Sequence, residues 1–161
     1  MTNIKKLQNK IIDKSLLKTI IKEQKNKKIV FTNGCFDIIH RGHINYLAQA
    51  ADYGDLLIVG LNSDKSVKKI KGNNRPVQDE KTRAEILAAL EFINYVIIFD
   101  EETPEQLIKL IKPNILIKGG DYKISEIVGG DFVISNGGRV VTIDFIKGHS
   151  TTDIINKIKN I

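Results

Sequence analysis

Two of the chain's three histidines, His40 and His43, flank an Arg-Gly pair in the segment FTNGCFDIIHRGHINYLAQA, residues 31–50. The segment follows a short apolar run and an Asn-Gly turn, so it is expected where a strand passes into a helix. Gly42 falls at the start of that helix, where free backbone N–H groups and the helix dipole attract anions. Two imidazoles at such an end suit phosphoryl or nucleotidyl transfer, in which charge develops on phosphate oxygens.

Two other interpretations of the histidine pair remain open from the residues alone. The first is a zinc site, which would need a third His, Cys or carboxylate at a suitable spacing. The second is that the histidines are incidental helix-cap residues. Neither common phosphate-binding motif is present, because no G-x-G-x-x-G follows the first expected strand and no G-x-x-x-x-G-K-[ST] occurs. A phosphate site in this chain would therefore depend on the histidine segment. Gly42, without a side chain, is expected to let a base or phosphate approach the backbone.

The composition is that of an ordinary globular domain of 161 residues, 42% hydrophobic and 27% charged. The net charge of +6 comes mostly from lysines spread along the chain, a pattern typical of a solvated surface rather than a nucleic-acid groove. The single cysteine excludes an intramolecular disulfide. The apolar runs are far shorter than the roughly 20 residues of a membrane span, and no signal-peptide block is seen. A cytoplasmic protein that binds neither nucleic acid nor membrane is expected.

Apolar runs alternate with helical periodicity along most of the chain, which predicts an α/β fold. We expect a Rossmann-like doubly wound sheet of five mainly parallel strands. An amphipathic helical extension over residues 1–26 precedes the main domain, residues 27–161. The expected strands are residues 27–34, 55–64, 94–100, 113–121 and 139–145. The expected helices are residues 42–53, 81–93, 103–112 and 150–160, with one further turn near 124–128.

Unusual polar residues gather just after the expected strands, as they should if a ligand binds at the carboxyl edge of a parallel sheet. Residues 65–80 are interpreted as a lysine-rich loop. Thr103 is expected to cap the helix whose first residue is Pro104. The segments that follow strands are residues 33–43, 62–64, 118–121 and 147–152.

The segment TNGCFDIIHRGH resembles the N-terminal signature of the cytidylyltransferase-like nucleotidyltransferase superfamily. The runs NSDKSVKKIKGNNRPVQDEKTRAEILAAL, IKGGDY and KGHSTTDIINKI resemble one branch, the D-glycero-β-D-manno-heptose 1-phosphate adenylyltransferase, or ADP-heptose synthase, family. The resemblance spans about residues 27–160. In many bacteria that branch is the C-terminal half of a fusion with a heptose kinase. No kinase part is present here, so the chain is similar to the stand-alone version.

The resemblance implies that a nucleoside triphosphate, with ATP expected, reacts with a sugar 1-phosphate, expected to be D-glycero-D-manno-heptose 1-phosphate. The products are a nucleoside diphosphate heptose for surface polysaccharide synthesis and pyrophosphate. The sugar phosphate oxygen attacks the α-phosphorus, so no protein nucleophile is needed. Mg²⁺ is the implied cofactor, and a homodimer is the implied assembly.

The resemblance also implies the roles of particular residues. The catalytic residues are expected to be His40, His43 and Lys71. Asp37 is expected to help hold Mg²⁺ in addition to binding nucleotide. The nucleotide-binding residues are expected to be Asn33, Gly34, Cys35, Phe36, Asp37, Gly42, Lys68, Lys118, Gly119, Gly148, Ser150, Thr151 and Thr152. The residues for the sugar phosphate are expected to be Asp64, Arg75, Arg83 and Asp121.

Simpler structural roles stay open for several of these residues. In this alternative interpretation, Lys68 and Lys71 are solvated surface lysines. Arg75 and Arg83 form structural ion pairs, and Asp121 caps a helix. The Ser-Thr-Thr run is otherwise a plain N-cap, and Cys35 is interpreted as a small residue in a tight turn. One departure from related transferases stands out: they often place an Arg near the Ser/Thr run, whereas this chain has Lys147 and His149 before it and Asp153 after it.

Two rival functions follow from the same residues. The first is another reaction of the superfamily, such as a heptose 1-phosphate transferase that uses GTP or CTP, or a glycerol-3-phosphate cytidylyltransferase. The second is a non-catalytic nucleotide-binding module that has kept the fold. A nucleic-acid-binding role rests only on the basic pI.

Overall fold

The sheet consists of parallel strands made from apolar runs in which Ile, Val and Leu dominate. The computed structural model describes residues 1–120 and 123–161. Strands buried on both faces have no solvent-facing side, so their sequences are continuously apolar rather than alternating. The strand order is β1-β4-β3-β2-β5-β6, and all pairs are parallel. The strands are β1 (Ile11–Ile12), β2 (Ile29–Gly34), β3 (Leu56–Asn62), β4 (Tyr95–Phe99), β5 (Ile115–Gly119) and β6 (Arg139–Ile143).

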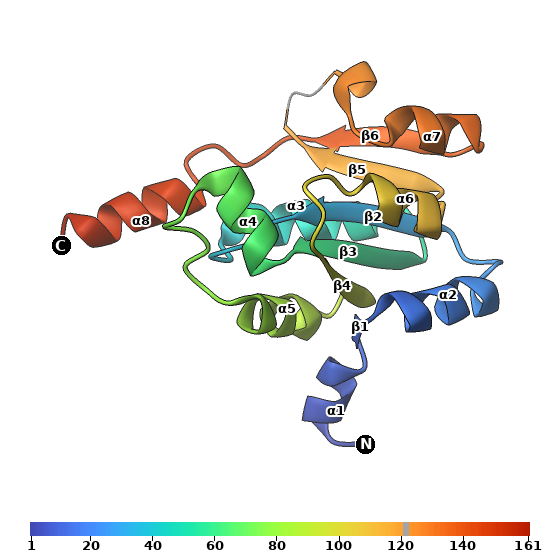
Figure 1. The fold of residues 1–161 in the computed structure, drawn as a ribbon, viewed down its shortest axis with the longest axis horizontal. Helices are drawn as coiled ribbons and strands as arrows, with labels where there is room; N and C mark the ends of the chain where they lie inside the picture. The colour runs from blue at the N-terminus through green and yellow to red at the C-terminus, as the bar shows by residue number, and fades with distance from the viewer. Residues whose placement is uncertain (121–122) are drawn as a thin grey trace.

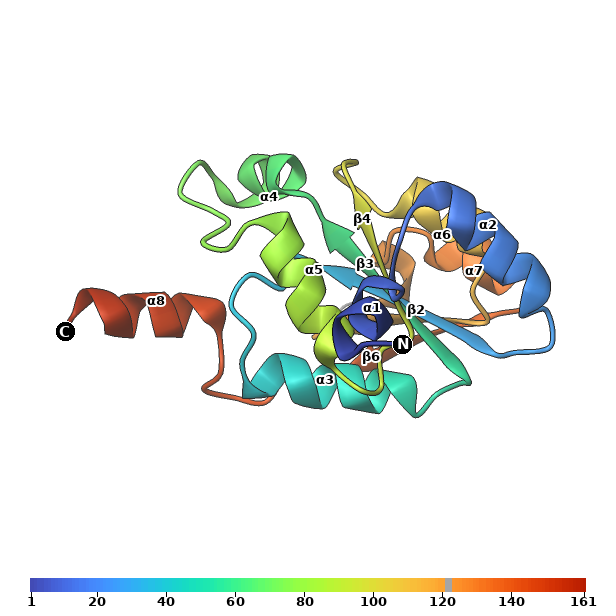
Figure 2. The same ribbon diagram turned by 90° about the horizontal axis from the view of Figure 1, so that it is seen from below.

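Helices cover both faces of this sheet, and the sheet separates the core into two apolar clusters (Figures 1 and 2). On one face lie α3 (Arg41–Ala51) and α5 (Glu80–Ala89), which contribute Leu47 and Leu87 to the core. The other face is covered by α2 (Lys14–Glu23), α6 (Glu105–Ile111) and α7 (Gly130–Ser135). This arrangement confirms the predicted doubly wound α/β fold of Rossmann type.

The N-terminal segment contributes more than the expected amphipathic helices. Between α1 (Asn3–Gln8) and α2, the two residues of β1 pair with β4 and add a sixth strand to the five predicted. Asp13 then begins α2 by accepting hydrogen bonds from the backbone N–H groups of Ser15 and Leu16. Leu17 on α2 is completely buried. The segment therefore shares both the sheet and the core with the rest of the chain.

Three further local features differ from the sequence prediction. The expected loop 65–80 begins with a helix, α4 (Asp64–Lys71), capped by Ser63, whose hydroxyl accepts from the N–H of Ser66. Its periodicity was hidden because lysines occupy half of its positions. The short α7 was also missed, whereas the expected turn near 124–128 is the 3₁₀ helix η1 (Ile124–Glu126). Thr103 is not the cap of α6; Pro104 takes that position without a side-chain hydrogen bond.

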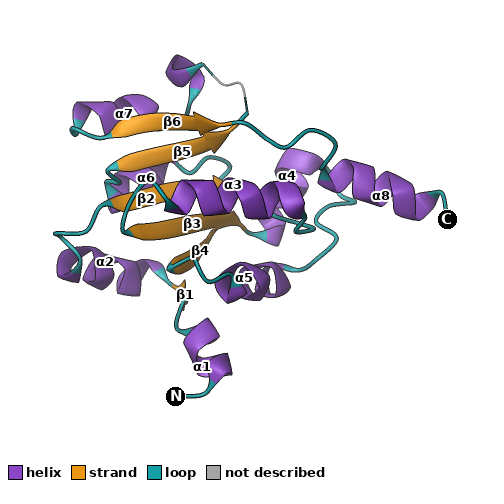
Figure 3. Ribbon diagram, turned by 180° about the vertical axis from the view of Figure 1, so that it is seen from behind, coloured by secondary structure: helices purple, strands orange, loops and turns teal. Residues whose placement is uncertain are grey.

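The last helix, α8 (Thr151–Lys159), extends away from the body of the molecule, and none of its residues is fully buried (Figures 1 and 3). Its N-cap is Ser150, whose hydroxyl accepts from the backbone N–H of Asp153. Within residues 1–120 and 123–161, no helix combines the length and the apolar character needed to cross a bilayer.

Substitution of Leu17 by Ala tests whether α2 belongs to the core. We expect the free energy of unfolding to fall by about 2–4 kcal/mol, because a buried side chain is lost and a cavity remains. The adjacent Leu16, which is 46% exposed, is the matched control, and Leu16→Ala should cost less than about 0.5 kcal/mol. Urea unfolding of both variants measures the difference; equal values would show that α2 is not packed as described.

Candidate functional site

A cavity of about 550 Å³ opens at the carboxyl ends of β2, β3 and β5. Its walls come from the β2–α3 turn, the C-terminal part of α4, the loop before α6 and the start of α8. Parallel strands end at one edge, so residues far apart in sequence meet there. The expected site residues that line this cavity are Asn33, Gly34, Cys35, Phe36, Asp37, His43, Lys71, Arg75, Lys118, Gly119, Thr151 and Thr152.

Other expected site residues do not line this cavity. Lys68 and Asp64 lie instead at a separate open depression lined by both lysines and carboxylates. Asp121 lies outside the described residues. The remaining residues that the cavity lining does not include are His40, Gly42, Arg83, Gly148 and Ser150.

The turn between β2 and α3 presents backbone N–H groups. Phe36 adopts a positive φ of 42°, which is unusual for a bulky residue and stores strain that the surrounding structure must hold. Among the described residues, the N–H groups of residues 35–39 donate to no protein acceptor. Successive free N–H groups at a turn of this kind form a concave anion site. The geometry therefore suits phosphate oxygens.

His43 faces the cavity, and His40 lies behind it. The two rings stack with centroids 3.8 Å apart, and His40 Nδ1 accepts a 3.4 Å hydrogen bond from the backbone N–H of His43. His40 is therefore the N-cap of α3, as the helix-cap interpretation of the sequence proposed. In the described part of the chain, no three His, Cys, Asp or Glu side chains are grouped to hold a metal ion, so the zinc interpretation gains no support.

The electrostatics of His43 favour a neutral imidazole. Burial, followed by the nearby charge of His40, lowers its pKa to about 4, although the backbone of Ile38 acts in the opposite direction. Burial also lowers the pKa of His40. His43 Nδ1 is buried without a hydrogen-bond partner among the described residues. At neutral pH the ring is therefore an uncharged group next to the free turn amides.

Two glycines allow close packing of the chain on itself rather than approach of a ligand. A Cβ on Gly42 would lie 3.0 Å from the His40 ring and 3.3 Å from the His149 carbonyl oxygen. The expectation that Gly42 leaves room for a base or phosphate is therefore wrong, because His40 and His149 fill that space. A Cβ on Gly119 would overlap the Phe145 ring, so Gly119 lets this half-exposed aromatic ring lie over the end of β5.

Lys118 is a partly buried cation at the end of β5. Its ammonium group donates a hydrogen bond to Asn33 Oδ1, and within the described residues no carboxylate pairs with it. Burial lowers its pKa to about 8. Because an unpaired buried charge is costly, this lysine favours the binding of an anion in the cavity.

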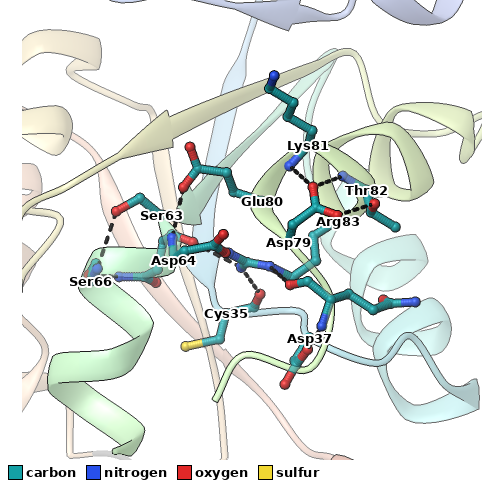
Figure 4. Close-up of polar contacts among 12 residues, drawn as sticks. Cys35, Asp37, Ser63, Asp64, Ser66, Asp79, Glu80, Lys81, Thr82 and Arg83 are labelled. Atoms are coloured by element: carbon teal, nitrogen blue, oxygen red, sulfur yellow. Dashed lines mark hydrogen bonds and ion pairs between the residues drawn. The ribbon is translucent and has the colours of Figure 1, made fainter. Parts of the chain in front are cut away.

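Arg83 does not reach the cavity. Its side chain is completely buried, and Figure 4 shows it among residues of several segments. Nη1 donates to the carbonyl oxygens of Cys35 (2.6 Å) and Asn62 (2.9 Å), and Nε donates to that of Gln78 (3.0 Å). Nη2 pairs with Asp64 Oδ1 at 2.8 Å. The prediction that Arg83 binds the sugar phosphate is therefore wrong, since its fully buried side chain is held in structural contacts. The same role for Asp64, whose side chain is 33% exposed, stays a prediction.

Asp37 is also buried, at 1% exposure, and both carboxylate oxygens are engaged. They accept from Arg75 Nε and from the backbone N–H groups of Val77 and Gln78. Burial by itself raises the pKa of Asp37, but these hydrogen bonds and the Arg75 charge outweigh it and hold the pKa below its usual range. This environment does not fit the expected Mg²⁺ ligand, and no step below is assigned to a metal ion.

Several lining residues were missed in the sequence. Tyr46 lies one helical turn after His43, a spacing that places both on one face of α3 and could have revealed it. The loop before α6 and the segment after η1 carried no chemical motif, so only the fold brings them here. The missed residues are Tyr46, Asn62, Ile70, Glu102, Thr103, Pro104, Glu126, Ile127, Val128 and Phe145.

The profile of the cytidylyltransferase-like family matches residues 31–157, from β2 into α8. The chain belongs to this family. The match includes the strained turn, the histidine pair and the Ser-Thr-Thr run. A cytidylyltransferase-like chain is a nucleotidyltransferase, so the family agrees with the anion-binding character of the cavity.

Among curated relatives, this cytidylyltransferase-like chain is similar to the bifunctional protein HldE of several bacteria. It is 58% identical over 134 residues to that of Geobacter metallireducens, covering 83% of this chain and 27% of the relative. It is 57% identical over 153 residues to that of Campylobacter jejuni subsp. doylei, covering 95% of this chain and 32% of the relative. The chain thus spans about a third or less of the length of these relatives.

Solved structures agree with the family fold. A lipopolysaccharide core biosynthesis protein from Thermoplasma volcanium superposes with a TM-score of 0.62 at 26% identity, over 76% of this chain and 99% of the other. Pantoate-beta-alanine ligase from Francisella tularensis gives a TM-score of 0.60 at 18% identity, over 94% of this chain and 78% of the other. The second likeness shows the fold alone.

The protonation of His43 can be followed directly by NMR. The midpoint of its imidazole titration is expected near pH 4 rather than at the ordinary 6.5, because the charged ring would be buried beside His40. Long-range ¹H–¹⁵N spectra of the wild type between pH 3.5 and 8 measure it, and His43→Gln identifies the signals. A midpoint above pH 6 would contradict the buried environment described for this ring.

Proposed function

We propose that this chain transfers the adenylyl group of ATP to D-glycero-D-manno-heptose 1-phosphate, which gives ADP-heptose and pyrophosphate for surface polysaccharide synthesis. The observation that carries the proposal is a cavity in which free turn amides, His43 and the partly buried Lys118 converge. The similarity to HldE proteins supports heptose phosphate as the second substrate. The homodimer implied by the family resemblance and the cytoplasmic location expected from the composition both stay predictions.

In the proposed reaction, an oxygen of the sugar phosphate attacks the α-phosphorus of ATP. A new P–O bond forms to the sugar phosphate, and the bond between the α-phosphorus and the bridging oxygen breaks as pyrophosphate leaves. The protein forms no covalent bond. Its contribution is to hold the reactants in line and to stabilise charge on the phosphate oxygens.

Each group of lining residues has a place in this mechanism. The amides of the β2–α3 turn and the neutral His43 side chain donate hydrogen bonds to phosphate oxygens as charge develops on them. Lys71 neutralises the departing pyrophosphate. Arg75 was expected from the sequence to bind the sugar phosphate, but we propose that it also neutralises the pyrophosphate, because it lines the same cavity as Lys71. Lys118 supplies a charge inside the cavity, where low polarity strengthens its attraction for phosphate. Thr151 and Thr152, at the start of α8, close the cavity on the other side.

Pyrophosphate release tests the proposal and separates its rivals. ATP, GTP, CTP and UTP are each combined with heptose 1-phosphate and with glycerol 3-phosphate, and ATP with heptose 1-phosphate is expected to be fastest. His43→Ala should lower kcat by about 10²–10³-fold, because one preorganised donor is lost. Circular dichroism confirms that the variant is folded.

Other outcomes of this assay have definite meanings. A preference for GTP, CTP or glycerol 3-phosphate replaces the proposed substrates with a rival of the same family. Nucleotide binding without pyrophosphate release from any pair identifies a non-catalytic module. Unchanged turnover in His43→Ala removes this histidine from the mechanism.

The pKa of Lys118 predicts how activity depends on pH. Its ammonium form is present below about pH 8 and is lost above it, so kcat/KM should fall as the pH rises through 8. Lys118→Arg stays cationic at every pH tested and should move this fall above pH 9, while its rate at pH 7 is lower because the buried site is shaped for lysine. Initial rates from pH 6.5 to 9.5 measure both; a fall at pH 8 in both proteins would assign it to another group.

A further inference from the structure

The carboxylate of Asp37 joins two segments that are far apart in sequence. Asp37 belongs to the β2–α3 turn, and its partners Arg75, Val77 and Gln78 lie in the segment that follows α4. The Oδ2–Nε distance to Arg75 is 2.6 Å, and the distances from Oδ1 to the amide nitrogens of Val77 and Gln78 are 2.8 and 2.9 Å. Protein donors therefore satisfy the hydrogen-bonding needs of this buried carboxylate.

Arg83 joins the same two segments from a second direction. Gln78 donates its backbone N–H to Asp37, and its own carbonyl oxygen accepts from Arg83. Arg83 in turn donates to the carbonyl of Cys35, two residues before Asp37. The contacts close a ring of Cys35, Asp37, Gln78 and Arg83, so the turn and the segment after α4 are held as one unit.

Arg75 is the member of this arrangement that reaches the cavity. Its Nε is bound to Asp37, its side chain is 20% exposed, and it lines the cavity wall. Within the described residues, neither of its two terminal nitrogens has a hydrogen-bond partner. A planar guanidinium held at one nitrogen keeps its remaining N–H groups in a fixed fork that matches phosphate oxygens.

We propose that Asp37 is a positioning residue rather than a metal ligand, and that it holds Arg75 so that the free guanidinium nitrogens bind a phosphate group in the cavity. The proposal rests on the proposed function only in requiring a ligand that carries phosphate. A metal ion at Asp37 would have to displace contacts to Arg75 and two backbone amides. The positioning role requires no displacement.

Binding of inorganic pyrophosphate in the presence of EDTA tests this proposal, because no metal takes part. Calorimetric titration compares the wild type, Asp37→Asn, Arg75→Ala and the double variant. Each single variant is expected to bind about ten-fold more weakly, as a charge-assisted contact or its orientation is lost. The double variant should bind no more weakly than Arg75→Ala, since Asp37 acts through Arg75.

The matched control is Asp79→Asn, the same substitution at an exposed carboxylate that caps α5. Asn also caps helices well, so this variant should bind pyrophosphate like the wild type. Wild-type binding by Asp37→Asn in EDTA, with a raised Mg²⁺ requirement for ATP binding, would overturn the proposal in favour of a metal ligand. Additive losses in the double variant would also overturn it, because they indicate a general structural role.

Circular dichroism establishes whether Asp37→Asn folds. If it does not, Arg75→Lys answers the question, because lysine keeps the charge but cannot contact Asp37 and a phosphate as a fork. About ten-fold weaker binding in EDTA supports the proposal, and wild-type binding overturns it. A wild type that binds no pyrophosphate overturns it as well. Failure of the proposed function is distinguishable, since it appears as absent turnover while the coupling between Asp37 and Arg75 persists.

Discussion

A buried guanidinium holds the candidate site together. Arg83 is completely removed from solvent, and such a charge is tolerated only when nearly all of its donors are satisfied. Its acceptors come from the β2–α3 turn, the end of β3, the start of α4 and the segment before α5. These segments must therefore lie at fixed positions around it. Displacing any one of them leaves part of a buried charge unpaired.

The fixed turn explains how a strained residue persists at the cavity. Phe36 keeps its positive φ because its ring is buried beside Gly34 and because the Cys35 carbonyl is held by Arg83. With that carbonyl directed toward Arg83, the planarity of the peptide group directs the next N–H the opposite way. Besides the carboxylates of Glu102 and Glu126, the cavity lining includes a neutral imidazole, two lysines and the turn that carries these amides. The arrangement is prepared for an anion before one arrives, which avoids reorganisation during the reaction.

The elements that the sequence did not reveal are either very short or have an apolar pattern that lysines interrupt. Two residues, Ile11 and Ile12, are too few to show a period, and they form a strand only because β4 offers a free edge. The helix α4 has lysine at half of its positions, so its apolar stripe is reduced to Val67 and Ile70. Likewise, the local sequence does not distinguish an arginine that is exposed to solvent from one that is buried in the interior. The burial of Arg83 depends on three carbonyl groups and one carboxylate that the local sequence does not specify.

From the sequence alone came the alternation of apolar strands and helices, the edge of the sheet where the cavity lies, and the histidine segment with its family resemblance. These depend on local periodicity and on motifs that are contiguous in the chain. Tertiary structure decided which charged residues face the cavity: Lys118 and Arg75 do, Arg83 does not, and Asp37 is occupied by the segment after α4. The physical reason is that the role of a charged side chain depends on its partners and its access to water. Apart from the contact of Arg83 with Gln78, five residues away, those partners lie 19 to 85 residues away along the chain.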